Sequence, residues 1–432
     1  MKLLRKTTLT ILSFLYLLSL VFAFNFNTER SVYADAALIE MNGTTYTSIQ
    51  DAIDAAPYDA ETEIKLSGNF SVASSITIEG DTTLGQKKLV FNIVGDTNIT
   101  RANNDPFIMF NIKALSNVTF TTSDEYTLVF DGNRFDSDLT SISSSILYVK
   151  ESTLSLQGNI TIQNNSSSTA GAILASTSSI LNINNVIFKK NKSTNNGGCI
   201  IVMGTANINN CKFYNNIGGS RGAGIFSQGN VRAVNCEFIG NSIGGYNAGS
   251  GAKTYGGSFA VEKGTNIIEN CIFKNGINKP LNSSVKESYG GAIAVTGGTL
   301  NIISANFENN TTDYGGAIAV TGGRLNVTDM TMTGNTALYE AGGIYVNGGV
   351  VQIANGTIGN NVGASGRAQD VYFVTSQASS CLFGAKITSL NTYAIYSNQD
   401  FVVGENFAVA SGSKINLENE KKIIVKEKLK TT

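Results

Sequence analysis

The chain has no histidine and no tryptophan, and only 3 of its 432 residues are proline. Without histidine, a Ser-His-Asp triad, an imidazole general base and an imidazole-liganded metal site are all excluded. Charged residues are also scarce, at 15% of the chain, whereas glycine is abundant with 45 residues. This composition is typical of an extended, exported β protein.

The chain has no basic surface of the kind that nucleic acid requires. Its formal net charge is −1, with 31 basic and 32 acidic residues. Residues 1–34 hold four basic residues and one acidic residue, which leaves 27 against 31, or −4, for the remainder. Nucleic acid is therefore not an expected partner. The lysine-rich stretch 421–430 is interpreted as a solvated edge strand, where lysines block unwanted pairing.

Only one long apolar run is present, from about Leu9 to Phe24. Lys2, Arg5 and Lys6 precede it, and the small-residue site Val32-Tyr33-Ala34 follows it. This arrangement predicts a signal peptide over residues 1–34 and an extracellular or cell-surface location; an uncleaved anchor is the alternative. No later run rivals it, so the mature chain is not expected to span a membrane.

The rest of the chain is organised around a repeat. The stretch YGGAIAVTGG begins at Tyr289 and again at Tyr314, and looser glycine motifs occur as AGAI, GGCI, GAGI, GGSF and AGGI, with starts that advance by 25 to 34 residues. A second motif precedes each glycine motif: an apolar residue followed three places later by asparagine, as in Phe188/Asn191. Phe273 departs from it, because Gly276 stands where asparagine is expected. A period of this size indicates a repeat array.

Within each period the apolar residues alternate, which predicts short strands and not helices. About three strands in some 25 residues form one turn of a solenoid. The predicted fold is all-β: a right-handed single-stranded parallel β-helix of roughly 13 coils. Equivalent positions in successive coils then lie about 4.8 Å apart and form ladders. Ladders are predicted for asparagines and for inward-facing thiols: Asn191, Asn216, Asn241 and Asn310, and Cys211, Cys236 and Cys271.

One short helix is predicted over residues 46–57. Thr47 and Gln50 fit a capping box, and the apolar residues that follow have helical spacing. Such a helix would cover the open first coil. The predicted organisation is therefore a signal peptide at 1–34, an N-terminal cap at 35–60, irregular coils at 61–160, regular repeat coils at 161–361, and C-terminal coils with a basic tail at 362–432. The chain stops in what reads as an ordinary strand, so we expect a fragment of a longer reading frame.

The pairing of GGA[I/L/V] with FxxN resembles the repeat of the chlamydial polymorphic membrane proteins. The similarity covers about 200 residues, from Ile162 to Asn361. It implies a pectin-lyase-like parallel β-helix displayed outside the cell and, in several members, adhesion to host surfaces. Units with GGSF, GAGI or FKNG depart from the motif, so the implied adhesion does not extend to them.

Pectin-lyase-like folds include polysaccharide lyases and glycoside hydrolases. Carboxylates of the chain are therefore candidate catalytic or metal-binding groups. Asp313 and Glu340 precede glycine motifs in adjacent coils and are predicted neighbours, with solvated loop carboxylates as the plainer interpretation. The run DGNRFDSD is denser, and is interpreted as a polar loop with a calcium site as the alternative; its carboxylates are Asp131, Asp136 and Asp138. No cofactor is expected.

A binding surface has more support. Tyrosines precede three successive glycine motifs, and two long insertions, 242–255 and 277–289, are predicted to protrude from the same face. The candidate ligand-binding residues are Tyr246, Lys253, Tyr255, Lys279, Lys286, Tyr289 and Tyr314. The alternatives are a stack that only rigidifies the coil edge and loops without function. The leading hypothesis is a monomeric, non-catalytic adhesin-like module for host-surface or cell-wall glycans or proteins; a polysaccharide-active enzyme and a structural spacer are the alternatives.

Overall fold

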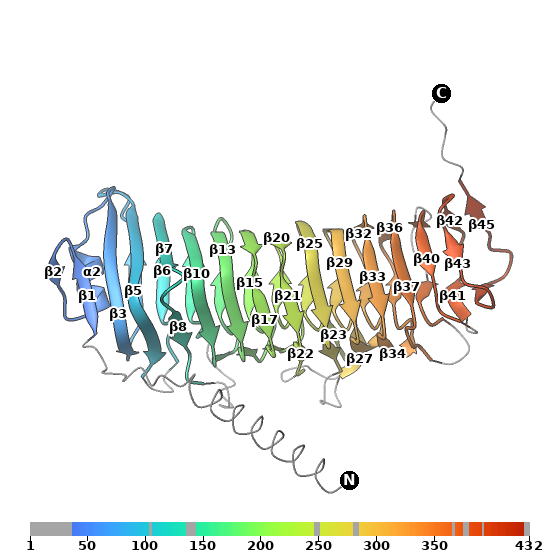
Figure 1. Ribbon diagram of the computed structural model, residues 1–432, viewed down its shortest axis with the longest axis horizontal. Coiled ribbons are helices and arrows are strands. Elements are labelled where there is room, and N and C mark those ends of the chain that lie inside the picture. The colour runs from blue at the N-terminus through green and yellow to red at the C-terminus, as the bar shows by residue number, and fades with distance from the viewer. Residues whose placement is uncertain are drawn as a thin grey trace, which may run out of the picture.

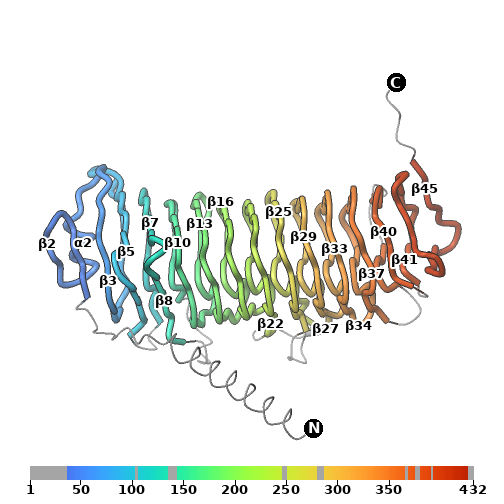
Figure 2. The backbone as a smooth tube through the Cα atoms, in the orientation of Figure 1, coloured from blue at the N-terminus to red at the C-terminus, as the bar shows by residue number. Residues whose placement is uncertain are grey.

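The computed structural model describes residues 37–102, 106–134, 144–245, 251–279, 285–364, 368–374, 380–390 and 393–426. The predicted parallel β-helix is confirmed: successive coils stack along the long axis of a rod, as Figures 1 and 2 show. The predicted signal peptide lies outside the described residues. No helix in the described part of the chain is long and apolar enough to cross a membrane.

One face of the rod is a parallel sheet with one strand from each coil. It matches the expected number of coils, and its 13 described strands are β4 (Ile76–Glu79), β6 (Phe110–Lys113), β9 (Leu147–Lys150), β12 (Ile173–Ala175), β15 (Ile200–Val202), β19 (Ile225–Ser227), β24 (Phe259–Val261), β28 (Ile293–Val295), β31 (Ile318–Val320), β35 (Ile344–Asn347), β38 (Val371–Val374), β41 (Tyr393–Ser397) and β44 (Lys414–Leu417).

A larger sheet bends around two further sides. Its 23 described strands are β1 (Leu38–Met41), β2 (Thr44–Thr45), β3 (Glu61–Val72), β5 (Lys87–Arg101), β7 (Ser116–Thr122), β8 (Leu128–Asp131), β10 (Thr153–Gln163), β13 (Ile180–Lys189), β16 (Thr205–Asn209), β17 (Lys212–Tyr214), β20 (Asn230–Val234), β21 (Glu237–Ile239), β25 (Thr265–Lys274), β29 (Thr299–Glu308), β32 (Arg324–Val327), β33 (Met330–Thr333), β36 (Val350–Ile353), β37 (Gly356–Gly359), β39 (Cys381–Leu382), β40 (Ala385–Ile387), β42 (Phe401–Val403), β43 (Ala408–Val409) and β45 (Ile423–Val425).

The third sheet lies between the asparagine and glycine motifs. Its nine described strands are β11 (Ser166–Ser167), β14 (Lys192–Ser193), β18 (Ile217–Gly218), β22 (Ser242–Ile243), β23 (Ala252–Tyr255), β26 (Ile277–Asn278), β27 (Val285–Tyr289), β30 (Thr311–Tyr314) and β34 (Thr336–Glu340). Strands β23 and β27 form the C-terminal ends of the two long insertions and pair with each other in parallel.

The bend in the large sheet is set by asparagines in the left-handed region. Asn185, Asn210 and Asn235 have φ values of 59°, 54° and 52°, a conformation that asparagine adopts more readily than most residues. At the opposite corner, Gly290 has φ 73°, and a side chain on Gly291 would strike the carbonyl of Gly316 in the next coil. The two motifs therefore mark corners, because each corner requires a backbone that other residues rarely adopt.

The interior is filled by ladders of like side chains. Phe188, Phe213 and Phe238 are fully buried, with ring centroids 4.9 and 4.6 Å apart and interplanar angles of 8° and 6°. The stack continues through Phe273 and Phe307 at 4.7 and 5.2 Å. Parallel offset rings at this spacing are a favourable aromatic geometry, so the coil rise itself suits phenylalanine.

The predicted cap is present, but its details differ. Helix α2 (Ile49–Ala55), the only helix of the described residues, buries Ile49, Ala52 and Ile53 in the core at the N-terminal end of the rod (Figure 1). The predicted Thr47/Gln50 capping box is wrong. Ser48 is the N-cap and accepts a 3.1 Å hydrogen bond from the backbone of Asp51, because Ser48 has the extended backbone that a cap needs.

Candidate functional site

The three tyrosines that precede glycine motifs form a stack outside the main core. The rings of Tyr255 and Tyr289 are 5.6 Å apart, and those of Tyr289 and Tyr314 are 5.1 Å apart, with interplanar angles of 15° and 16°. Tyr289 is only 4% exposed, and the other two are partly buried. Because each ring covers the face of the next, ligands would reach mainly ring edges and hydroxyl groups here.

The stack continues through tyrosines that the sequence analysis missed. The ring centroid of Tyr345 lies 5.0 Å from that of Tyr314. The ring of Tyr372 lies 5.6 Å from that of Tyr345, and the ring of Tyr396 lies 4.5 Å from that of Tyr372. These later tyrosines come from a different column, the outward-facing middle position of the 13-stranded sheet. We call the six residues Tyr255, Tyr289, Tyr314, Tyr345, Tyr372 and Tyr396 the lateral strip.

Two columns merge into one strip because their side-chain sizes are complementary. The outward middle position is occupied by Ala294 and Ala319 in the coils where a corner tyrosine is present, and both alanines are buried. In the next coil the corner residue is Glu340, and the middle position becomes Tyr345. The sequence could have revealed the strip through the alternation of large and small residues in these two columns. Recognising that alternation requires knowing which residues of the two columns lie side by side.

Charged residues border the strip. Lys253 forms a 2.7 Å ion pair with Glu287, and its Nζ lies 5.4 Å from the centre of the Tyr289 ring. The Tyr289 hydroxyl donates a 2.6 Å hydrogen bond to Glu287. Burial, and then this hydrogen bond, raise the pKa of Tyr289, whereas the hydrogen bond from Lys253 lowers the pKa of Glu287. Tyr289 is therefore a neutral donor over the physiological pH range.

The predicted binding residues are only partly brought together. Lys253, Tyr255, Tyr289 and Tyr314 meet at the strip. Lys279 is exposed just after β26, and its neighbour Asn278 donates a 2.9 Å hydrogen bond to the carbonyl of Tyr289. Tyr246 and the side chain of Lys286 lie outside the described residues. The ends of the insertions flank the strip through β23 and β27, as the sequence predicted for their common face.

An exposed region adjoins the strip near Tyr314. Tyr339 is 45% exposed, and its ring is 5.3 Å from that of Tyr314. Leu338 next to it is 49% exposed. Val362 is 52% exposed, and its backbone pairs in parallel with Thr336, which lies in β34 together with Leu338 and Tyr339. We call Leu338, Tyr339 and Val362 the exposed patch.

The predicted asparagine ladder is structural and fully buried. The Oδ1 of Asn216 accepts hydrogen bonds from the backbone and side chain of Asn191 at 3.0 and 3.2 Å, and Asn241 accepts from Asn216 in the same way at 3.0 Å. The ladder breaks at Gly276, whose backbone still donates to Asn310 at 2.8 Å. It resumes through Asn310, Asn335 and Asn361.

The predicted thiol column is also present. Cys211, Cys236 and Cys271 are 0–1% exposed, and the backbone N–H of Cys236 donates to the Cys271 sulfur at 3.4 Å. All five cysteines are buried free thiols. Chiefly its hydrogen bond to Cys211, together with burial, raises the pKa of Cys236 to about 12, which makes this thiol unreactive. Burial likewise raises the pKa of Cys199.

The carboxylates considered for catalysis or metal binding are engaged in hydrogen bonds. Asp131 accepts from the backbone of Asn133 and the side chain of Gln163, both at 2.7 Å, while Asp136 and Asp138 lie outside the described residues. Asp313 and Glu340 lie in the neighbouring strands β30 and β34; Glu340 is only 9% exposed and so is not the solvated carboxylate expected, whereas Asp313 is partly exposed. Within the described ranges, no three acidic or cysteine residues are grouped to hold a metal ion.

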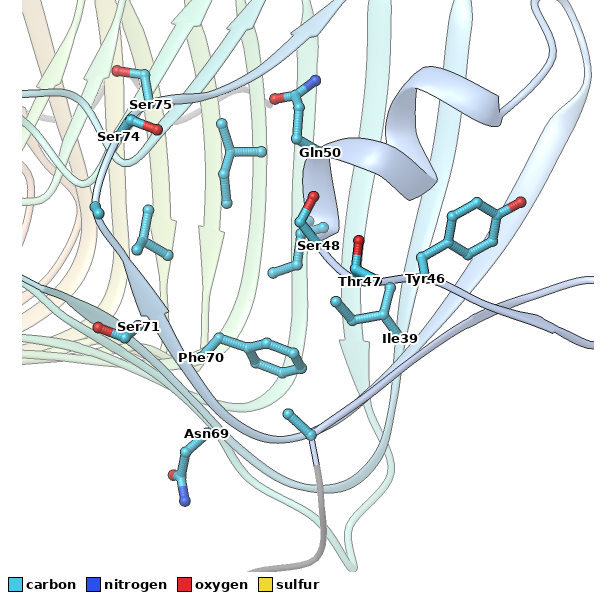
Figure 3. A pocket seen from close by; sticks show the side chains of 15 residues that line it. Ile39, Tyr46, Thr47, Ser48, Gln50, Asn69, Phe70, Ser71, Ser74 and Ser75 are labelled. Carbon is cyan, nitrogen blue, oxygen red and sulfur yellow. The ribbon is translucent and has the colours of Figure 1, made fainter.

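One pocket adjoins the N-terminal cap. It encloses about 450 Å³ between the start of α2, strand β1 and the corner that joins β3 to β4 (Figure 3). Sequence reasoning missed it, because its walls come from three segments whose contact depends on how the cap packs.

Comparison with protein-family models, with curated proteins and with solved structures finds no match to this chain.

Proposed function

We propose that this chain is an exported surface β-helix that binds glycans or proteins of a host surface or cell wall, without catalysis of its own. The proposal rests on the exposed patch that adjoins the lateral strip. Leu338 and Tyr339 of β34 are 49% and 45% exposed, and Val362, which pairs with the same strand, is 52% exposed. Grouped exposed apolar residues beside polar groups are a common feature of binding sites.

The chemistry of the patch suits a ligand with both apolar faces and hydrogen-bonding groups. The ring of Tyr339 is tilted 39° from that of Tyr314 and so does not lie flat against it. One face of the Tyr339 ring is therefore open for packing against a ligand. Neighbouring hydroxyls of the strip supply polar contacts. Strand β34 is paired with β30 on one side and with Val362 on the other, so little backbone entropy is lost on binding.

The resemblance of the repeats to the polymorphic membrane proteins supports the same proposal, as does the predicted signal peptide. Catalysis has less support, because carboxylates of the repeat coils take part in structural hydrogen bonds. Asp313, for example, accepts a 3.1 Å hydrogen bond from the backbone of Ser288. A glycosidase needs two carboxylates placed on either side of a sugar ring.

The test measures binding of the purified protein to cultured host cells and to an array of glycans. Tyr339→Ala combined with Leu338→Ser is expected to lower the affinity by about tenfold, since each removes an exposed contact. Phe383→Ala is the matched control, because Phe383 is 40% exposed but follows β39 of the large sheet, whereas the patch lies on β34 of the nine-stranded sheet.

Equal binding by both variants would remove the patch from the proposal and favour a structural spacer. Incubation with polyuronides, with reducing and unsaturated ends measured, is the second assay. Clear turnover that Asp313→Asn abolishes would contradict the non-catalytic role.

A further inference from the structure

The pocket at the N-terminal cap is built from groups of two kinds. Its floor consists of the buried side chains of Ile39, Ile49, Val72 and Ile76, which are 4–7% exposed. Tyr46 and Phe70 are partly buried and form its aromatic walls. Exposed hydroxyl side chains lie at the opening, and Figure 3 labels them: Thr47, Ser74 and Ser75. Asn69 and Ser71 alternate with Phe70 and Val72 along β3 and face outward, where Asn69 accepts a 2.8 Å hydrogen bond from Asn98.

The walls of this pocket are held in place before any ligand arrives. The side chain of Gln50 accepts a 2.8 Å hydrogen bond from the backbone of Thr77 and donates one of 3.1 Å to its carbonyl, which fixes α2 against β4. The backbone of Tyr46 donates to the carbonyl of Ile39 at 2.9 Å. A preformed pocket of this size, within the range of roughly 300–1,000 Å³ found for ligand sites, loses little entropy on binding.

The lining contains no charged side chain among its fifteen residues. A charged ligand would lose its hydration without gaining a counter-charge, which is unfavourable. A purely apolar ligand would leave the exposed hydroxyl groups of the opening bonded to water, whereas a ligand with its own hydroxyls can bond them directly. The lining instead matches a ligand with apolar C–H faces and many neutral hydroxyl groups.

We propose that this pocket binds a neutral saccharide, with a sugar ring packed against Tyr46 and Phe70 and its hydroxyls bonded to the serine and threonine side chains at the opening. This site is separate from the exposed patch. The patch lies in the coil of β34, whereas the pocket lies at the N-terminal end of the rod (Figure 1). Either site can therefore fail without the other.

The experiment titrates the purified protein with cellotriose, chitotriose and maltotriose by isothermal calorimetry, with trigalacturonate as the charged comparator. At least one neutral trisaccharide is expected to bind saturably with a Kd on the order of 1 mM or tighter. Its affinity should stay constant between about 0.05 and 0.5 M NaCl, because no ion pair contributes. Trigalacturonate should bind at least tenfold more weakly.

Ser74→Trp places a large side chain at the opening and is expected to abolish binding. Ser123→Trp, at an exposed turn elsewhere, is the matched control and should bind as the unchanged protein does. Phe70→Leu keeps the apolar packing but removes the ring, and should weaken binding at least fivefold; it serves if Ser74→Trp does not fold. Absence of saturable binding by all three neutral sugars, or binding that Ser74→Trp and Phe70→Leu leave unchanged, would overturn the proposal.

Discussion

Removal of one rung of the asparagine ladder is the most direct test of how the coils are held together. In Asn216→Ala, the backbone N–H of Asn191 loses the acceptor that lies 3.0 Å away, and the carbonyl of Phe188 loses the donor that lies 3.0 Å away. Each buried group left unpaired costs about 1–3 kcal/mol, so the two together cost about 2–6 kcal/mol. The side chain of Asn191 retains its bond to the carbonyl of Ile162, at 2.9 Å.

The free energy of unfolding is measured by urea denaturation, followed by far-ultraviolet circular dichroism. Because a solenoid can open locally, hydrogen exchange at the Asn191 amide is measured as well. Asn207→Ala is the matched control in the same coil: its amide donates to Asn182 at 3.1 Å, but on an exposed face where water replaces the lost bond. That control should change stability by no more than about 0.5 kcal/mol. Similar small losses from both variants, without faster exchange at Asn191, would refute the reasoning.

Three other changes test separate features. Burial raises the pKa of the Asp370 carboxyl, which is fully buried at the end of the ladder and accepts from Asn361 at 2.8 Å. The unchanged protein should therefore lose stability as the pH rises from the unfolded carboxyl pKa, about 3.9, to the higher folded pKa, whereas the stability of Asp370→Asn should not fall over this range. Melting temperatures measured from about pH 4 to 8 check this, and parallel pH profiles of the two proteins would contradict it. Ala341 has φ 56° at a corner where the preceding coils have glycine, so its backbone is strained. Ala341→Gly is therefore expected to raise the free energy of unfolding by about 0.5–1 kcal/mol in urea denaturation, and a decrease would show that this backbone strain is absent. Phe238 has stacked neighbours at 4.6 and 4.7 Å, so Phe238→Ala should cost about 3–5 kcal/mol by the same assay, whereas Phe383→Ala, 40% exposed, should cost far less; equal losses would contradict the stack.

Much of the fold was predictable, because a parallel β-helix repeats a small set of local requirements. Asparagine in the left-handed region, as at Asn210, and glycine at the other corner are preferences of single residues. Period-2 alternation between these corners identifies inward positions such as Phe213 without reference to any other coil. The coil length then follows from the spacing of the motifs.

The helix cap shows where local rules become ambiguous. Thr47 and Ser48 are adjacent and chemically equivalent as caps, and Ser48 takes the role because its backbone is extended there. Thr47 instead donates a 2.7 Å hydrogen bond to the side chain of Asp51. A choice between neighbours of this kind depends on how the helix packs on the first coil.

The lateral strip and the cap pocket were decided by tertiary structure. Tyr314 and Tyr345 occupy different columns, 31 positions apart, and meet only because a corner side chain leans over an alanine of the neighbouring sheet. The pocket likewise joins Tyr46 to Phe70 across two strands. The sequence alone determined the inward ladders and the corners, because these depend on backbone preference and on burial of like residues at a constant rise. Contacts between different columns depend on side-chain sizes in adjacent coils, and so only the folded rod brings them together.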